Sequence, residues 1–367
     1  MASTIWNLSI KAEQMKRIET RKLNVGGVAL GGGAPVTVQS MCTTDTRDAA
    51  ATLAQIGRLH GAGCEIVRVA VPDRTAAEAL KQICAESPLP RAADIHFDYR
   101  LALAAVKAGA AKIRINPGNI GGADRVRAVA DECGAAGVPI RIGINSGSIE
   151  KHLLERYGHP TAEAMAESAA GHIALLEDCG FHDICLSLKA SDVPLTVAAY
   201  RIAAERFPYP LHLGVTEAGT AYMGTVSSAV GIGALLMEGI GDTIRVSLTA
   251  DPVEEARAGI AILKAAGLRR GGVKMISCPT CGRTQIDLIA AAEAVEAALA
   301  GLNRNLTVAV MGCAVNGPGE AREADYGLAG GKGEAVLFKK GKIVGKVPEG
   351  EMVSALLRLI ETETETE

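Results

Sequence analysis

One pattern repeats eight times between residues 36 and 266 of this chain. A short run rich in Val, Ile and Leu ends in polar residues, and a stretch rich in Ala, Leu, Glu and Lys at helical spacing follows it. Eight strands alternating with eight helices predict a (β/α)8 TIM barrel. A doubly wound sheet is the alternative, but it has fewer repeats and carries a glycine fingerprint after its first strand. The strand-like runs are 35–41, 65–71, 92–97, 111–118, 139–145, 183–189, 211–216 and 243–249.

The pattern changes after residues 267–272. Two strand-like runs, 273–277 and 306–312, bracket a helical stretch over 286–302. A hairpin over 335–347, turning at Lys340-Gly341, and a terminal helix follow. We therefore expect a substrate-binding barrel domain over 1–266 and a smaller α/β domain over 267–367. The glycine-rich segment 26–33 precedes the first barrel strand, so it predicts a hairpin that plugs the barrel.

The composition narrows the class of protein. The net charge is −3 and aromatic residues make up 3%, which argues against a general nucleic-acid binder. The first residues hold no apolar run of signal-peptide length, and no stretch of about 20 apolar residues occurs. We expect a cytoplasmic protein without a membrane segment, whose nine cysteines are reduced thiols or metal ligands.

Polar residues end nearly every barrel strand, where the active site of a (β/α)8 barrel lies. Four arginines and one lysine among them would repel one another unless an anion lies there, and arginine matches phosphate oxygens. We predict a phosphorylated substrate, specifically a diphosphate. The alternative is that some of these residues only pair with carboxylates or point outward. The candidates are Arg68, Asp94, His96, Arg114, Asn116, Arg141, Asn145, Lys189, His212, Glu217, Arg245 and Ser247.

Two carboxylates, Asp94 and Glu217, are available for proton transfer among these cations. Glu217 follows Thr216 at a strand tip and is our choice for the acid/base group; a structural counter-ion is the alternative for both. His96 and His212 each lie in an apolar strand run, which favours a structural or substrate-orienting hydrogen bond over metal ligation.

Three cysteines stand apart from the six scattered through the barrel. Cys278 and Cys281 follow one strand of the second domain, and Cys313 ends the next. A C-x-x-C pair suits zinc, redox chemistry or an iron–sulfur cluster. Zinc usually takes a fourth Cys or His, yet no His follows His212, and a redox pair leaves Cys313 unexplained. Three cysteines fit a [4Fe-4S] cluster with one distinct iron, for which Glu320 is the nearest carboxylate; a solvated loop carboxylate is the alternative.

The motifs CPTCGRTQ (278–285) and MGCAVNGPGEAREADYG (311–327), behind a barrel containing VQSM, KIRINPGN and LGVTEAG, closely resemble the 4-hydroxy-3-methylbut-2-enyl diphosphate synthase family. The resemblance implies a TIM barrel followed by a ferredoxin/sulfite-reductase-like domain. It implies a [4Fe-4S] cluster held by Cys278, Cys281, Cys313 and Glu320, with Asn316 among the substrate-binding residues. One departure is Cys42, where the pattern has Thr.

The implied reaction is the two-electron conversion of 2-C-methyl-D-erythritol 2,4-cyclodiphosphate into the open-chain allylic diphosphate and water, in non-mevalonate isoprenoid biosynthesis. Flavodoxin or ferredoxin would supply the electrons, and Glu320 as well as Glu217 would take part in catalysis. The implied assembly is a head-to-tail homodimer in which each cluster domain caps the partner's barrel. The alternative function is a barrel synthase for a diphosphate-bearing substrate, such as a pteroate synthase, with a structural zinc.

Overall fold

Strands and helices alternate through the first three quarters of the chain. The computed structural model describes residues 16–300, 302, 304–313 and 322–362. The chain divides into two compact units, Met1–Arg269 and Arg270–Glu367. Glu320 and Asn316, two of the predicted site residues, lie outside the described residues.

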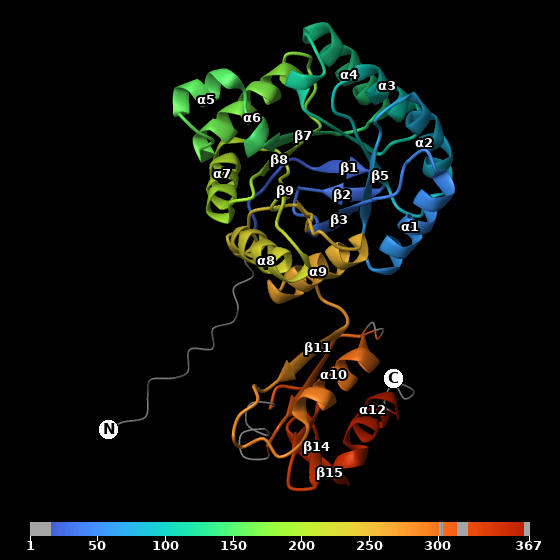
Figure 1. The fold of residues 1–367 in the computed structure, drawn as a ribbon, viewed down its shortest axis with the longest axis vertical. Coiled ribbons are helices and arrows are strands. Elements are labelled where there is room, and N and C mark those ends of the chain that lie inside the picture. Colours follow the sequence, from blue (N-terminus) through green and yellow to red (C-terminus); the bar gives the residue numbers. More distant parts are fainter. Residues whose placement is uncertain (1–15, 301, 303, 314–321, 363–367) are drawn as a thin grey trace. The chain divides into compact units, whose positions relative to one another are not determined.

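The first unit is built around eight parallel strands that close into a barrel (Figure 1). Their order in the sheet is β8-β7-β6-β5-β4-β3-β10-β9, and a bridge between Leu186 and Leu211 joins the two edges. The predicted (β/α)8 barrel is therefore confirmed. The strands are β3 Thr37–Met41, β4 Ile66–Ala70, β5 Arg91–Asp94, β6 Lys112–Ile115, β7 Ile140–Asn145, β8 Ile184–Lys189, β9 His212–Leu213 and β10 Thr243–Ile244.

Helices surround these strands, and most of them begin at an Asp or Thr that follows the strand end. The side-chain oxygen of such a residue accepts a hydrogen bond from a first-turn amide, which fixes where the helix starts. The capping residues are Asp48, Asp73, Asp98, Thr161, Asp192 and Asp251. The helices are α1 Ala49–Gly61, α2 Arg74–Glu86, α3 Tyr99–Lys107, α4 Ala123–Ala136, α6 Ala162–Glu177, α7 Val193–Arg206, α8 Ala221–Met237 and α9 Pro252–Ala265.

Two features of the barrel differ from the sequence-based prediction. A short extra helix, α5 Lys151–Tyr157, follows β7. The runs 211–216 and 243–249 form only two residues of strand each, β9 and β10. Gly214, directly after β9, packs tightly against Lys189 and Arg245. A Cβ at this position would lie 2.6 Å from both Lys189 Nζ and the Arg245 carbonyl oxygen.

Successive residues of each strand point to opposite faces of the barrel wall. Lys112 on β6 donates a 2.8 Å hydrogen bond to Gln39 Oε1 on β3, and these strands are not neighbours in the sheet. Both side chains therefore point into the barrel. Arg114, two residues after Lys112, shares this inward face, whereas Ile113 packs in the hydrophobic core.

A hairpin closes the end of the barrel where the strands begin. Its strands are β1 Leu23–Val25 and β2 Val28–Leu30, which lie across the ring of strands in Figure 1. Its apolar side chains pack against Ile66, Ala92 and Cys185 near the starts of β4, β5 and β8. The predicted plug is thus present, and the opposite end is left as the mouth.

The second unit is a five-stranded sheet with helices packed on it. The strand order is β11-β12-β13-β14-β15; the first three strands run parallel and the last two pair antiparallel. The hairpin turns at Lys340 and Gly341, as predicted. None of the described helices could cross a membrane. The elements are β11 Val273–Ser277, α10 Leu288–Leu299, β12 Leu306–Met311, β13 Tyr326–Gly330, β14 Glu334–Lys339, β15 Lys342–Pro348 and α12 Met352–Thr362.

Candidate active site

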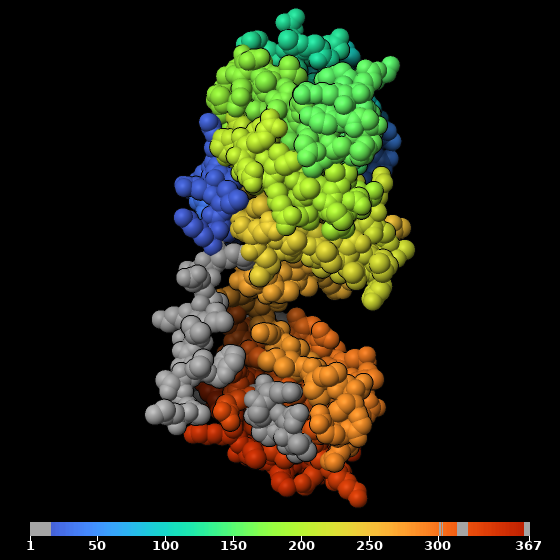
Figure 2. Space-filling model, turned by 90° about the vertical axis from the view of Figure 1, so that its left-hand side faces the viewer, coloured from blue at the N-terminus to red at the C-terminus, as the bar shows by residue number. Residues whose placement is uncertain are grey.

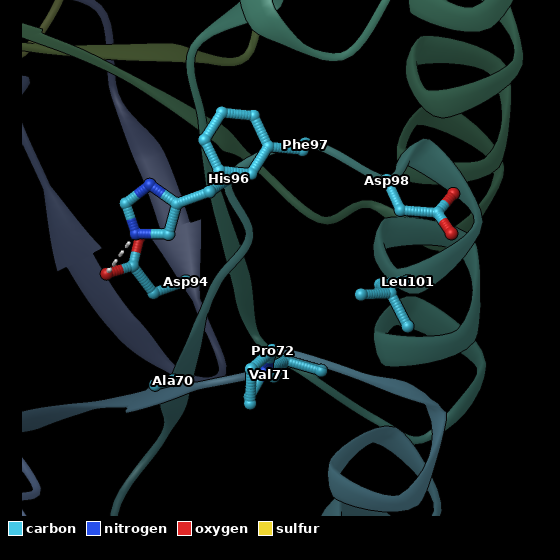
Figure 3. Close-up of a pocket in the computed structure, with 8 residues that line it drawn as sticks. All are labelled: Ala70, Val71, Pro72, Asp94, His96, Phe97, Asp98 and Leu101. Atoms are coloured by element: carbon cyan, nitrogen blue, oxygen red, sulfur yellow. Dashed lines mark ion pairs between the residues drawn. The ribbon is translucent and has the colours of Figure 1, made fainter.

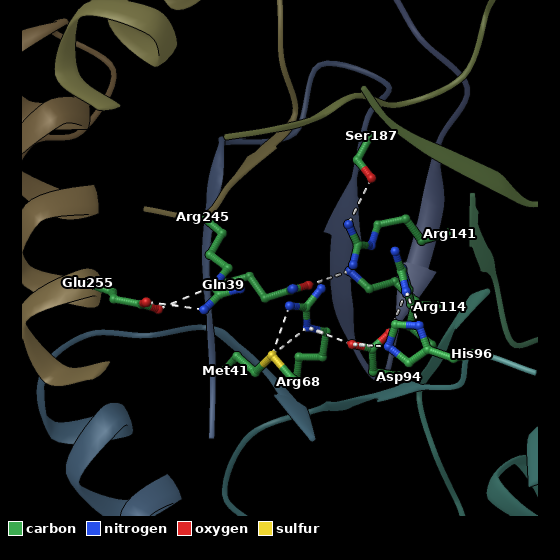
Figure 4. Close-up of polar contacts among 11 residues, drawn as sticks. Gln39, Met41, Arg68, Asp94, His96, Arg114, Arg141, Ser187, Arg245 and Glu255 are labelled. Carbon is green, nitrogen blue, oxygen red and sulfur yellow. Dashed lines mark hydrogen bonds and ion pairs between the residues drawn. The ribbon is translucent and has the colours of Figure 1, made fainter. Parts of the chain in front are cut away.

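Arginines from neighbouring strands converge on Asp94 at the mouth of the barrel (Figure 4). Arg114 Nη1 lies 3.1 Å from Asp94 Oδ1, and Arg68 Nε lies 3.6 Å from Oδ2. Arg68 also contacts Met41 Sδ with two nitrogens, at 2.8 and 3.1 Å. One buried carboxylate is therefore shared between two guanidinium groups.

Arg141 and Lys189 add two further buried cations, and neither has a carboxylate within ion-pair distance among the described residues. Arg141 Nη1 donates to Ser187 Oγ at 2.9 Å, while its Nε and Nη2 are buried without a hydrogen-bond partner among the described residues. Burial, with Arg114 nearby, lowers the Arg141 pKa to about 10. Burial together with Arg141 and Arg245 also lowers the Lys189 pKa well below its ordinary value. A bound anion would stabilise the charged forms of both groups.

Asp94 stays ionised in this setting. Burial by itself would raise the pKa of its carboxyl, but Arg68, Arg114 and Arg141 together lower it below the ordinary value. An ionised, cation-paired carboxylate cannot donate a proton near neutral pH. Asp94 is therefore better suited to fixing the arginines than to acid catalysis.

Arg245 has a carboxylate partner that the sequence analysis missed. Its Nε and Nη2 lie 3.2 and 3.1 Å from the two oxygens of Glu255 on α9. Glu255 also accepts from Ser40 Oγ at 2.9 Å. The alternative considered above, pairing with a carboxylate, thus holds for Arg245. Glu255 lies on a helix, outside the strand ends that were searched.

His96 lies beyond the end of β5, not within a strand as predicted. Its side chain is 58% exposed, and its Nδ1 is 3.3 Å from Arg114 Nη1. Figure 3 shows His96 beside Asp94 in a pocket of about 260 Å³ that is also lined by Phe97 and Leu101. An exposed imidazole at this position can reach a ligand in the mouth.

His212 is fully buried in the barrel interior, and its Nδ1 lies 3.4 Å from Thr243 Oγ1. Burial and the cations Lys189 and Arg141 lower its pKa well below 6.5, so the ring is neutral. Its Nε2 has no hydrogen-bond partner among the described residues, which leaves one nitrogen for a ligand. Asn116 is also buried, and its Oδ1 accepts from the Gly118 amide at 3.1 Å.

A second pocket at the mouth contains Glu217 and Asn145. It measures about 470 Å³ and is otherwise lined by Ser146–Ser148, Ser191 and Thr216. Glu217 has a φ of 52°, a left-handed conformation that is uncommon outside glycine and occurs often at functional sites. Ser247 lies beyond β10, half-buried. The arrangement can hold a polyanion against the arginines with Glu217 beside it.

Two of the three distinctive cysteines come from neighbouring strands of the second unit. Ser277, the last residue of β11, pairs with Val310 on β12, so Cys278 and Cys313 both lie just beyond the ends of adjacent parallel strands. Cys278 Sγ accepts from the Gly312 amide at 3.1 Å. The amide of Arg283 lowers the Cys281 pKa. The lowered pKa favours the thiolate form of Cys281, which is the form that binds metal. Within the described residues no group of three potential ligands is already gathered.

The remaining cysteines are free thiols within the barrel unit. Burial raises the pKa of Cys42 to about 12, so this departure from the family pattern introduces an unreactive thiol. Cys133 and Cys64 are likewise buried with raised pKa values. These buried thiols behave as small apolar residues.

Fold and site together define a two-domain barrel enzyme with a mouth rich in buried cations and a cysteine-bearing second domain. Residues 20–260 match the GcpE TIM-barrel domain, and residues 274–362 match the GcpE protein C-terminal domain. The chain belongs to the GcpE family, so the predicted family and its oxidoreductase class are confirmed.

Curated relatives match nearly the whole chain. A 4-hydroxy-3-methylbut-2-en-1-yl diphosphate synthase (flavodoxin) of Geobacter sulfurreducens is 61% identical over 345 residues, 94% of this chain and 98% of its own. The protein of that name from Clostridium perfringens is 57% identical, covering 95% of this chain and 100% of its own. These relatives give no support to the alternative of a barrel synthase with structural zinc.

The barrel is also similar to a solved structure of N-acetylneuraminic acid synthetase from Leptospira borgpetersenii. That match has a TM-score of 0.51 at 11% identity and covers 68% of this chain and 90% of the other. At this identity the similarity concerns the fold alone.

Proposed function

We propose that this chain catalyses the reductive ring opening of 2-C-methyl-D-erythritol 2,4-cyclodiphosphate to (E)-4-hydroxy-3-methylbut-2-enyl diphosphate and water. The observation that carries the proposal is the excess of cations over carboxylates at the mouth. Two buried carboxylates, Asp94 and Glu255, face five cations. This excess suits a diphosphate. The cations are Arg68, Arg114, Arg141, Lys189 and Arg245.

The binding roles follow from the geometry of each side chain. Arg141 and Lys189 contact the diphosphate, because each is buried in the mouth without a described carboxylate partner. Asp94 holds Arg68 and Arg114 toward it. His212 offers its free Nε2, while further polar groups at the rim, Asn116, Asn145, His96 and Ser247, orient the carbon skeleton. Asn316 of the second domain joins them.

Glu217 donates the proton that the departing oxygen needs to leave as water. Its pocket is shared with Asn145 and Thr216, at the end of the barrel where the cations gather. Asp94 cannot take this role, because its arginine partners keep it ionised. A carboxyl group at the mouth that has no arginine within ion-pair distance among the described residues suits general acid catalysis.

Cys278, Cys281 and Cys313 would hold a [4Fe-4S] cluster, with Glu320 as the fourth ligand. The donor set fits, because the three thiols follow adjacent strands and Cys278 already accepts an amide hydrogen bond of the kind that stabilises cluster sulfur. When bound, the cluster supplies electrons one at a time and a Lewis-acidic iron for the substrate oxygen. Flavodoxin is the electron donor we propose, with ferredoxin as the alternative.

We further propose a homodimer with cross-chain sites, because chain length argues against a site built within one protomer. Arg269 is fixed at the start of the strands, where its Nη2 donates to the Val36 carbonyl at 3.0 Å and lies 2.7 Å from Glu65 Oε2. From Arg269 to Cys278 the chain spans at most ~30 Å. To reach the mouth of its own barrel, the chain would have to pass around a helix ~10 Å wide, follow a strand ~20 Å long and then turn inward. The length of that path exceeds the ~30 Å that the segment can span.

Helix α8 offers the surface for such a dimer. Tyr222, Met223, Val226, Val230 and Met237 are all exposed, and their spacing places them within one 100° stripe of the helix. Figure 2 shows this segment, coloured yellow, at the surface of the barrel unit. A second copy of the chain would cover this stripe by pairing α8 with α8 about a two-fold axis.

Anaerobically purified protein tests the proposed function. We expect four irons and four sulfides per chain, binding of the cyclodiphosphate in calorimetry, and turnover when reduced flavodoxin is added. A colourless protein with one zinc per chain and no affinity for the cyclodiphosphate would overturn it.

A further inference from the structure

His172 on α6 lies outside the barrel strands but contacts the loops that follow two of them. The imidazole is 4% exposed. Its Nδ1 accepts from the Gly118 amide at 3.2 Å, and its Nε2 lies 2.6 Å from Glu150 Oε1. Gly118 belongs to the loop after β6, and Glu150 precedes α5 in the loop after β7. One side chain thus joins two loops of the mouth.

Only one protonation state of the ring satisfies both contacts. Burial lowers the His172 pKa although Glu150 opposes this, so the ring is neutral. The Gly118 amide can only donate, so Nδ1 is the acceptor, and the ring hydrogen of the neutral imidazole lies on Nε2. The Gly118 amide therefore sets the tautomer, and Nε2 lies close to Glu150 without a well-directed hydrogen bond among the described residues.

The approach of the loop to His172 depends on glycine. A Cβ on residue 118 would lie 2.5 Å from His172 Cε1, closer than real Cβ atoms come. The same Gly118 amide also lies 3.1 Å from Asn116 Oδ1. This amide is thus shared between an outer histidine and Asn116, a residue we assign to the substrate.

Because the Gly118 amide has two acceptors, the side chain of Asn116 can turn toward a ligand. With Asn116 as the single acceptor, turning its carboxamide toward a ligand would leave the Gly118 amide without an acceptor from the protein. With His172 as second acceptor, the carboxamide can exchange Gly118 for the substrate while the amide stays bonded. The contact to Glu150 meanwhile ties this loop to the segment Ser146–Ser148, which lines the pocket of Glu217.

We propose that His172 is a positioning residue that holds the loop after β6 in its binding geometry and frees Asn116 to contact the substrate, with Glu150 coupling this loop to the one after β7. The proposal rests on the proposed function for the identity of that substrate. The loop contact itself does not depend on it.

Two amide substitutions separate the two halves of the contact. In His172→Asn the side-chain oxygen occupies the position of Nδ1 and still accepts from Gly118. In His172→Gln the amide reaches the position of Nε2 and keeps only the contact to Glu150. His172→Phe keeps the ring volume and loses both. His152→Phe, at an exposed position on α5, is the control.

We expect His172→Gln and His172→Phe to raise KM for the cyclodiphosphate about tenfold while kcat changes less, since about 1.4 kcal/mol corresponds to tenfold. His172→Asn should remain within about twofold of the wild type. Glu150→Leu should also raise KM. Because Glu150 is partly exposed, this substitution disturbs the fold less than a change at the buried His172. Equal KM values for His172→Asn and His172→Gln would reduce His172 to a packing residue and overturn the proposal.

Hydrogen exchange supplies a readout that needs no substrate. The Gly118 amide, followed in peptides spanning 112–122, should exchange faster in His172→Gln and His172→Phe than in the wild type and His172→Asn. This pattern in a protein that fails to bind the cyclodiphosphate would contradict the proposed function and leave the loop contact standing. Unchanged exchange in every variant would overturn the loop contact.

Discussion

The Arg245 guanidinium lies side by side with the Glu255 carboxylate, with Nε 3.2 Å from Oε2 and Nη2 3.1 Å from Oε1. Glu255 is 3% exposed and also accepts from the Leu248 amide at 3.0 Å. This pair fastens the end of β10 to α9. It also means that the protein itself compensates one of the five cations at the mouth.

Glu255→Gln should therefore destabilise the fold. Removing the charge leaves Arg245 largely buried without its carboxylate, and we expect the free energy of unfolding to fall by ~2–3 kcal/mol in urea titrations. The neighbouring Glu254 pairs with Arg257 at an exposed site, so Glu254→Gln is a matched control with an expected loss below ~0.5 kcal/mol. Equal losses in the two variants would show that the Arg245–Glu255 pair contributes nothing.

Arg114→Ala and Arg141→Ala should weaken binding of the cyclodiphosphate. Each loses a charged hydrogen bond to the diphosphate, worth ~1.5–3 kcal/mol in calorimetry. Arg58→Ala serves as control, because Arg58 on the outer helix α1 pairs with Asp251 at an exposed site. Wild-type affinity in both variants would refute the barrel mouth as the anion site.

Glu217→Gln should separate turnover from binding. The amide keeps the shape of the side chain and cannot donate a proton as an acid does, so kcat should fall ~100-fold or more with little change in affinity. A fall in affinity without a fall in kcat would instead make Glu217 a binding group.

The sequence predicted the barrel because the alternation of apolar strands and helices is local information. It also predicted Arg68, Arg114 and Arg141 at one mouth, since the ends of parallel strands share one face of a barrel. It could not predict that Glu255 and His172 contact this site. Both lie on helices, and their partners are fixed by packing between elements distant in the chain.

Position along a strand was also harder to predict than the existence of the strand. His96 was expected within an apolar strand, yet β5 ends at Asp94, and the histidine is exposed in the following loop. After Asp94 the chain leaves the barrel wall and runs to α3, which begins at Tyr99. Apolar residues such as Ile95 continue the pattern without continuing the strand.

Replacing Cys278, Cys281 or Cys313 by Ser should abolish the cluster, because a serine hydroxyl is a poor substitute for a thiolate ligand. Iron and sulfide analysis and the visible spectrum would measure the loss. Cys133→Ser, at a buried barrel thiol, should keep full iron content. Full iron and activity in Cys313→Ser would contradict the assigned ligands.

Lys112 makes stability depend on pH in a defined window. Burial lowers the pKa of its ammonium group to about 7. Above that pH the unfolded lysine binds a proton that the folded lysine does not, so the free energy of unfolding rises by up to ~1.4 kcal/mol per pH unit toward the unfolded pKa. Lys112→Met should lose this slope between about pH 7 and 9. The exposed Lys107→Met should keep it, and a slope unchanged by Lys112→Met would mean that Lys112 stays charged.

The proposed dimer can be tested through α8. Val230→Lys places a charge in the middle of the apolar stripe and should give monomers in light scattering. Gln82→Lys makes the same change of charge on the exposed face of α2 and should leave the dimer intact. Monomeric Val230→Lys should keep its cluster and its affinity for the cyclodiphosphate but lose turnover, since no partner caps the barrel. Full turnover by monomers would refute the cross-chain site.

Mixed dimers test the same arrangement without disturbing the interface. Glu217→Gln damages the barrel site of one chain, and Cys281→Ser damages the cluster of the other. If each barrel uses the partner's cluster, a heterodimer of the two contains one site with both lesions and one site with neither. Activity should therefore return to about half of wild type per heterodimer, given that independent sites add. Heterodimers that form, as shown by two affinity tags, and stay inactive would place each complete site within a single chain.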